Sequence, residues 1–118
     1  MLPKRHRLRK PSDFTAVLRG GGHGGARRAG APRLVVHGRH MTTRVGSPAR
    51  VGFVVSGAVG NSVVRHRVTR RLRALMAKRI GQFPAGTDLV VRANPLAAHS
   101  DSASLRSDLD RSLRRVLQ

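Results

Sequence analysis

The segment from Asn61 to Arg79, NSVVRHRVTRRLRALMAKR, constrains the fold of this chain more than any other part of the sequence. At about 100° per residue, a helix gathers the apolar side chains of this segment on one continuous stripe. Asn61 is a favourable N-cap, and Gly81 and Pro84 end the periodic pattern. The stripe must be buried against other elements of the fold. Its residues are Val64, Val68, Leu72, Leu75 and Met76.

The rest of this predicted helix is cationic. No acidic residue occurs between Arg50 and Asp88, so nothing nearby in the sequence neutralises the segment. Like charges three or four residues apart on a helix repel each other, and an anionic partner would relieve that repulsion. The side chains opposite the stripe or beside it are Arg65, His66, Arg67, Arg70, Arg71 and Arg73.

The charge of the whole chain indicates the same kind of partner. The 118 residues include 24 Lys or Arg and 5 Asp or Glu, which gives a formal net charge of +19. All but Lys4, Lys10 and Lys78 of these cations are arginines, whose planar guanidinium groups bind phosphate oxygens in pairs and stack on bases. Nucleic acid is therefore favoured over a lipid surface. Because the only aromatic residues are 3 Phe, contacts to phosphate and shape must supply most of the affinity.

Periodicity elsewhere predicts one further long helix, one short helix and four strands. Ser12 and Asp13 begin a short helix that carries Phe14, Val17 and Leu18. Strands are predicted at 34–37, 40–44, 50–56 and 89–93, and the strand at 50–56 has two apolar faces, as an interior strand would. A C-terminal helix capped near 100–102 carries Leu105, Leu109, Leu113, Val116 and Leu117.

These elements predict a single nucleic-acid-binding domain over residues 1–118 with the order αβββαβα, and the family resemblance given below implies that the nucleic acid is RNA. The fold class is α/β (α+β), a two-layer sandwich with a four-stranded mixed sheet, because strand, helix and strand in succession imply a parallel pair. Residues 20–31 are expected to be a flexible Gly-rich loop, and residues 1–10 an extended basic arm. The cations of the arm are Lys4, Arg5, Arg7, Arg9 and Lys10.

The sequence offers little for catalysis by the protein. It has no Cys, which excludes disulfides and thiolate metal sites, and no Glu. Asp108 and Asp110 lie about 200° apart around a helix, so they cannot share a metal ion, and we expect them to pair with Arg111 and Arg114. We therefore predict no catalytic residue and no metal site in the protein. No apolar run approaches the roughly 18 residues of a membrane span, and no export signal is evident, so no membrane association is expected.

Several motifs together resemble the bacterial ribonuclease P protein family. They are DF at 13–14, RVG at 50–52 and, above all, VGNSVVRHRVTRRLR at 59–73. The resemblance implies a cytoplasmic protein bound to a catalytic RNA subunit, and together they remove the 5′ leader of precursor tRNA. It also implies that the helix that begins at Asn61 joins the strands at 50–56 and 89–93 by a left-handed crossover. Mg²⁺ is then expected in the holoenzyme, bound mainly by the RNA, with no obligate protein partner.

The same resemblance assigns candidate site residues. The family contacts its RNA subunit at positions that correspond to Asn61, Arg65, His66, Arg67, Arg70, Arg71 and Arg73. Phe14, Leu18 and His37 correspond to a cleft, between the first helix and the sheet, that receives the single-stranded leader. By this interpretation the protein lowers repulsion between RNAs and adds affinity for leader-bearing substrate without supplying catalytic groups.

Two other functions fit the residues less well. One is a ribosomal or nucleoid-type basic protein that binds RNA or DNA and has no catalytic role. The other is a self-sufficient ribonuclease that uses His37 and His66 as general acid and base, although no spacing in the sequence orients a histidine pair. The identity of the RNA that copurifies with the protein, and activity without RNA, would distinguish these alternatives.

Overall fold

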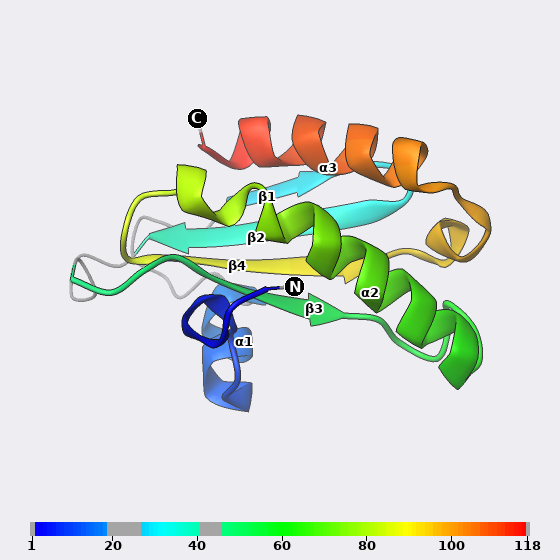
Figure 1. The fold of residues 1–118 in the computed structure, drawn as a ribbon, viewed down its shortest axis with the longest axis horizontal. Helices are drawn as coiled ribbons and strands as arrows, with labels where there is room; N and C mark the ends of the chain where they lie inside the picture. Colours follow the sequence, from blue (N-terminus) through cyan, green and yellow to red (C-terminus); the bar gives the residue numbers. More distant parts are fainter. Residues whose placement is uncertain (1, 19–26, 41–45, 118) are drawn as a thin grey trace.

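The computed structural model describes residues 2–18, 27–40 and 46–117, and shows the predicted order of three helices and four strands (Figure 1). Each long helix is capped as the sequence suggests. The Asn61 side chain accepts a 3.0 Å hydrogen bond from the Val64 amide, and Asp101 accepts one of 2.7 Å from the Ser104 amide. The elements are η1 (Lys4–His6), α1 (Pro11–Leu18), β1 (Arg27–Gly30), β2 (Leu34–His40), β3 (Arg50–Val54), α2 (Ser62–Ala77), η3 (Ile80–Gln82), β4 (Thr87–Ala93), η4 (Pro95–His99) and α3 (Ser102–Leu117).

The four strands form one mixed sheet in the order β1-β2-β4-β3. β1 pairs with β2 and β2 with β4 in the antiparallel sense, and β3 lies parallel to β4. β3 is therefore at the edge of the sheet, and the prediction that it is an interior strand is wrong. Its two apolar faces reflect coverage from both sides: Val51 faces the main core, and Val54 packs with the apolar side chains beside α1.

The connection from β3 through α2 to β4 is left-handed. In Figure 1 both strands point to the right, α2 lies in front of the sheet, and the chain rises from the lower strand to the upper one. Parallel strands joined by a helix are right-handed in nearly all proteins. The handedness implied by the family resemblance is therefore the one that the fold adopts.

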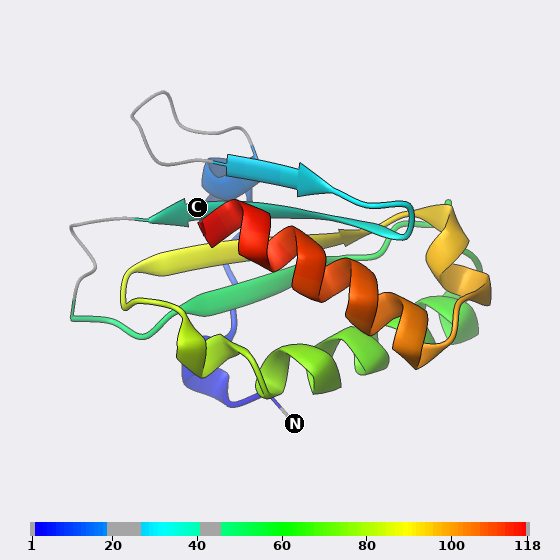
Figure 2. The ribbon, with the colours of Figure 1, turned by 90° about the horizontal axis from the view of Figure 1, so that it is seen from above.

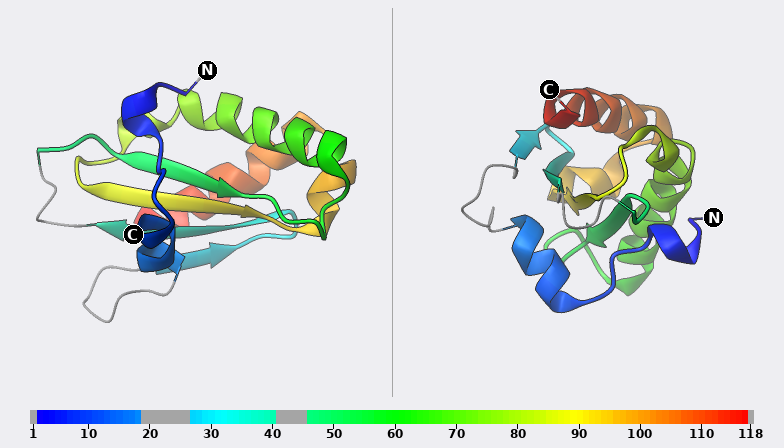
Figure 3. Two further views of the ribbon diagram at one scale, coloured as in Figure 1. Left: turned by 90° about the horizontal axis from the view of Figure 1, so that it is seen from below. Right: turned by 90° about the vertical axis from the view of Figure 1, so that its left-hand side faces the viewer.

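The long helices lie on one face of the sheet and the short α1 lies on the other (Figures 2 and 3). Val68, Leu72 and Met76 of α2 are fully buried in the main core, as the predicted stripe requires. α3 approaches β2 closely because Gly38 has no side chain: a Cβ atom at Gly38 would lie 2.5 Å from Val116 Cγ1. The two-layer packing positions α2 with its cationic side facing outward.

The first strand lies earlier in the chain than the sequence suggested. Arg27–Gly30, within the loop predicted for 20–31, form β1, whereas residues 20–26 lie outside the described residues. Ala29 is the one buried side chain of β1, so this strand lacks the alternation by which strands are recognised in a sequence. Of the strand predicted at 40–44, His40 ends β2, and 41–45 also lie outside the described residues.

The N-terminal residues are folded, which corrects the prediction of an extended arm. Leu2 is buried in the main core, Leu8 is buried beside α1, and residues 4–6 form η1. The Leu8 amide donates a 3.0 Å hydrogen bond to the Val51 carbonyl, so the arm covers part of the free edge of β3. Two buried leucines anchor the arm.

In the part of the chain that the structure describes, no helix is both long and apolar enough to cross a membrane.

Candidate RNA interface

α2 presents three exposed cationic or imidazole side chains, those of His66, Arg70 and Arg73. The buried stripe fixes the rotation of the helix, so these side chains point away from the sheet. None of the three forms an ion pair with an aspartate of the described ranges. They are the part of the predicted RNA-subunit site that is free to bind a ligand.

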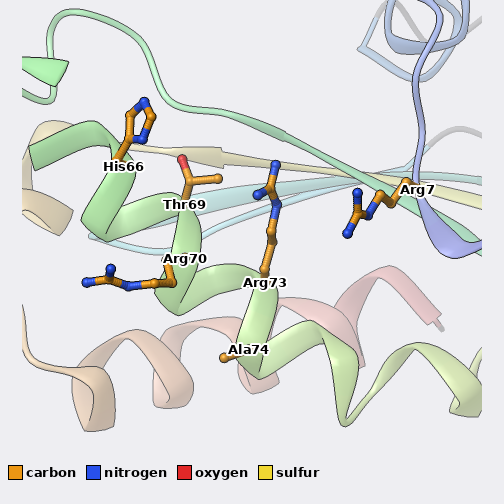
Figure 4. A pocket seen from close by; sticks show the side chains of 6 residues that line it. All are labelled: Arg7, His66, Thr69, Arg70, Arg73 and Ala74. Atoms are coloured by element: carbon orange, nitrogen blue, oxygen red, sulfur yellow. The ribbon is translucent and has the colours of Figure 1, made fainter. Parts of the chain in front are cut away.

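A surface hollow of about 580 Å³ lies along this side of α2 (Figure 4). We call it the cationic hollow. Arg7 enters it from the N-terminal arm, whereas Arg73 enters it from α2 (Figure 4). The Arg7 side chain is oriented by a 3.0 Å hydrogen bond from its Nε to the Leu2 carbonyl. The lining residues are Arg7, His66, Thr69, Arg70, Arg73 and Ala74.

A second hollow of about 350 Å³ continues towards the beginning of α2 and shares His66 and Arg70 with the first. Ser62, Val63 and Arg67 complete its lining. The sequence predicts Arg7 in an extended arm and does not connect it with α2. Only the burial of Leu2 and Leu8 brings Arg7 beside that helix, and no local pattern indicates this contact.

Three of the predicted RNA-binding arginines are half-buried. Arg67 donates a 3.1 Å hydrogen bond to the Ala98 carbonyl, and Arg71 donates one of 3.0 Å to the Ser100 carbonyl. Both therefore attach the segment around η4 to α2. Arg65 lies at the edge of the stripe, and its buried Nε, like that of Arg67, has no hydrogen-bond partner. Substitution of Arg67 or Arg71 would affect the fold as well as any ligand.

The carboxylates are engaged elsewhere in the fold. Arg50 binds Asp88 through two hydrogen bonds of 3.0 and 2.9 Å, and also lies 3.5 Å from Asp13. The Arg111–Asp108 pair, at 3.3 Å, is confirmed, but Asp110 binds Arg79 rather than Arg114. The pKa of Asp110 is lowered, mainly by its hydrogen bond from Arg79. No described carboxylate faces the cationic hollow.

The carboxylates also do not form a metal site. Among residues 2–18, 27–40 and 46–117, no three His, Asp or Glu side chains gather in a way that could hold a metal ion. Asp108 accepts hydrogen bonds from the Arg33 amide and from Arg111, and Asp101 caps α3. The donor set of the described residues therefore does not fit a protein-bound Mg²⁺.

The residues predicted for the leader cleft lie together on the α1 side of the sheet. Phe14 and Leu18 are half-buried and pack with buried Leu8, Val17 and Val90. Gly52 allows the contact with the Phe14 ring, because a Cβ atom at Gly52 would overlap Phe14 Cζ. His37 is opposite Val90 in the register between β2 and β4, so it faces the same side.

The surroundings of His37 favour its neutral form. Burial lowers the pKa of His37, and the positive charges of Arg28 and Arg92 lower it further. His66 belongs to α2, on the opposite side of the sheet. The two histidines suggested as a general acid–base pair are therefore separated by the sheet, which argues against that nuclease mechanism.

Comparison with known proteins shows the family. The family model described as Ribonuclease P matches residues 2–117. This chain belongs to the ribonuclease P protein family. It is 49% identical over 123 residues to the ribonuclease P protein component of Streptomyces griseus, an alignment that covers 99% of this chain and 96% of the relative. Identity to the ribonuclease P protein component of a Nocardioides species is 47% over 116 residues, which cover 98% of this chain and 95% of that one.

Solved structures of ribonuclease P proteins have the same fold. The Staphylococcus aureus RNase P protein superimposes with a TM-score of 0.79 at 21% identity, over 92% of this chain and 93% of that one. The Thermotoga maritima RNase P protein, solved in complex with 1-(4-fluorophenyl)-2-thiourea, gives a TM-score of 0.76 at 24% identity, over 92% and 98% of the two chains. At these identities the likeness shows the shared fold alone.

Proposed function

We propose that this chain is the protein subunit of ribonuclease P and binds the catalytic RNA subunit through the cationic hollow and the adjoining residues of α2. The observation that carries the proposal is the segregation of charge: His66, Arg70 and Arg73 are exposed beside Arg7, and no described carboxylate faces them. Arginines that share one hollow without carboxylate partners suit successive phosphate groups of an RNA backbone. Asn61 caps the start of α2. Arg67 and Arg71 donate hydrogen bonds to the segment around η4, and Arg65 lies at the edge of the buried stripe.

The protein assists catalysis electrostatically rather than by acid–base chemistry of its own. In the assembled enzyme its cations lower the repulsion between the catalytic RNA and the precursor tRNA. The catalytic groups and the Mg²⁺ ions that the cleavage requires belong to the RNA, because the described aspartates are occupied by arginines or by the cap of α3. Such a ribonucleoprotein acts in the cytoplasm, where precursor tRNA is made.

The second RNA contact is the leader cleft of Phe14, Leu18 and His37. These side chains lie on the opposite side of the sheet from the cationic hollow, so the protein can bind the RNA subunit and the leader at the same time. The cleft binds the 5′ leader of the precursor but has no ligand in mature tRNA. Preferential binding of substrate over product assists turnover.

The test of the RNA-subunit site is a pair of double variants. Arg70→Gln with Arg73→Gln removes two exposed arginines of the cationic hollow. The matched control, Arg106→Gln with Arg115→Gln, removes two exposed arginines of α3. We expect the first double variant to weaken binding to the RNA subunit and to lower the log–log salt slope by about 0.7–0.9 for each phosphate group that is no longer bound. The control is expected to retain the affinity and slope of the wild type.

Equal behaviour of the two double variants would show that α2 is not the RNA site.

Activity is tested with the same proteins: precursor tRNA should be cleaved by protein, RNA subunit and Mg²⁺ together, and not by RNA-free protein. The ribosomal or nucleoid alternative predicts that another RNA, or DNA, copurifies with the chain. Sequencing of the bound nucleic acid therefore distinguishes that alternative from a ribonuclease P subunit.

A further inference from the structure

Part of the α1 side of the sheet is not covered by any described helix. α1 lies over β2 and β4, where Val17 packs with Val90, and its Phe14 side chain reaches Gly52 of β3. Beyond the end of α1, the last residues of β3 and β4 face outward, as seen from below in Figure 3. This uncovered area adjoins Leu18 and His37 of the leader cleft.

One side chain of the interior strand β4 is exposed here. Thr87–Ala93 is buried at every position except Arg92. Arg92 is opposite Val35 of β2 and Val54 of β3, and Val54 packs beside α1, so the Arg92 side chain lies on the α1 side. Arg92 has no carboxylate partner among the described residues. The strand thus places an arginine without a carboxylate partner on the α1 side of the sheet.

A second arginine lies on the same surface. Arg28 of β1 is directly opposite His37 of β2, whereas its neighbour Ala29 faces the main core. Arg28 is exposed and also lacks a carboxylate partner within the described ranges. Residues directly opposite in an antiparallel pair have Cβ atoms about 5 Å apart, and diagonal neighbours about 7–8 Å. Arg28 is the direct neighbour of His37, and Arg92 is its diagonal neighbour on the other side.

The imidazole of His37 therefore lies between two arginines from two different strands. Burial of the ring, and then the charges of Arg28 and Arg92, disfavour protonation of His37. A neutral imidazole is a flat surface for a base and also offers a hydrogen bond. The guanidinium groups on either side of the ring can bind a phosphate, and the ring itself can stack with a planar group. A nucleotide has both parts, an anionic phosphate and a planar base.

We propose that Arg28 and Arg92 bind a phosphodiester of the single-stranded leader across His37, and that protonation of His37 strengthens this contact. This inference rests on the proposed function, because it takes the leader as the ligand of this side of the sheet. It adds two arginines to the cleft and assigns it a pH response. The site discriminates precursor from product, because mature tRNA has no leader phosphate to place there.

The direction of the pH response follows from charge balance. A bound phosphate offsets the positive potential of Arg28 and Arg92, so the pKa of His37 is higher in the complex than in the free protein. Affinity for the leader therefore rises as the pH falls through the interval between those two pKa values. Asp88 and Asp13 are bound to Arg50 and do not neutralise the site. The charged groups that the strands and α1 carry on this side of the sheet are Arg28, Arg39, Arg50, Arg92, Asp13 and Asp88.

The first arm of the test removes the charge of each arginine and leaves a shorter, polar side chain. Holoenzyme is assembled with Arg28→Gln, Arg92→Gln or the control Arg115→Gln, and its affinity is measured for precursor tRNA and for mature tRNA. We expect each sheet variant to lower the affinity for precursor about three- to tenfold, the range for the net contribution of one ordinary hydrogen bond, and to leave the affinity for mature tRNA unchanged. Thermal unfolding of each variant confirms that the sheet is intact.

The second arm measures the same affinities between about pH 8 and about pH 5.5, an interval that includes the ordinary histidine pKa of about 6.5. The preference of wild-type holoenzyme for precursor over mature tRNA should increase a few-fold towards acid. His37→Asn, which cannot be protonated, should abolish that increase, whereas the control His99→Asn, at an exposed histidine outside both proposed sites, should retain it.

The outcomes separate this inference from the proposed function. If wild-type holoenzyme prefers precursor but Arg28→Gln and Arg92→Gln keep that preference, the leader binds elsewhere and the inference is wrong while the proposed function stands. If the pH response persists in His37→Asn, His37 is not its source. If the chain neither binds the RNA subunit nor supports cleavage, the proposed function itself is wrong.

Discussion

At the scale of single residues, the contact between Gly52 and Phe14 joins the fold to the candidate leader cleft. A Cβ atom at Gly52 would overlap two atoms of the Phe14 ring and would lie 3.1 Å from Leu8 Cβ. Gly52 therefore allows α1 and the N-terminal arm to approach β3 together. Phe14 is half-buried and packs with Leu8, Val17 and Val90.

We expect Gly52→Ala to destabilise the protein by about 1–3 kcal/mol, because the new methyl group displaces the Phe14 ring. The measurement is urea unfolding of Gly52→Ala, Phe14→Leu and the double variant. In the Phe14→Leu background, Gly52→Ala should cost less, since the ring that it strikes is gone. Additive costs of the two substitutions would contradict the packing described above.

At the scale of elements, ion pairs between residues far apart in the sequence connect the secondary structure. Arg50 at the start of β3 binds buried Asp88 of β4 and also reaches Asp13 of α1. Arg33, which precedes β2, binds Asp108 of α3 through both the backbone amide and the side chain of the arginine. Each pair joins segments that are distant along the chain. Buried pairs of this kind fix relative positions more than they add net stability.

Arg50→Ala is expected to destabilise the protein by about 2–3 kcal/mol, because the buried Asp88 carboxylate is deprived of its bidentate partner. The matched control is Arg111→Ala, which removes an arginine from another buried aspartate, Asp108. Asp108 remains bound to Arg33, and Arg111 is 55% exposed, so the control should cost less than about 1 kcal/mol. Chemical denaturation of both variants measures the difference, and equal costs would refute this account.

At the scale of the whole molecule, positive charge is neutralised inside the fold and left unpaired on one side of α2. The chain has a formal net charge of +19, and none of the described carboxylates offsets the positive charge of the cationic hollow. Arg7, Arg70 and Arg73 therefore repel one another in the free protein. The arrangement costs stability in the free protein and, under the proposed function, contributes affinity when RNA binds, which is the usual conflict between a binding surface and a stable one.

Arg70→Gln is accordingly expected to raise the midpoint of thermal unfolding of the free protein at low salt and to weaken binding to the RNA subunit. The gain in stability should fade near 1 M salt, where the screening length is only about 3 Å. Arg115→Gln is the control, because Arg115 lies in the last turn of α3, where a positive charge interacts favourably with the helix dipole. A lower midpoint for Arg70→Gln at low salt would show that Arg70 stabilises the fold.

Local patterns in the sequence were sufficient to predict the helices, the parallel pair, the cationic side of α2 and the family. The patterns are the period of Val64, Val68 and Leu72, the N-cap Asn61, and arginines without nearby acids. The motifs around them carried the family resemblance. Phe14, Leu18 and His37 came from that resemblance alone, and in the structure they lie on one side of the sheet.

The position of β1, the edge position of β3, the place of Arg7 beside α2 and the partner of Asp110 became clear only from the packed fold. β1 has a single buried residue, so its strand exists only through its pairing with β2. Arg7 reaches α2 because Leu2 and Leu8 are buried in two separate clusters. Asp110 binds Arg79, 31 residues away, rather than its helical neighbour. Contacts between distant segments depend on how the layers pack, and no local pattern in the sequence encodes them.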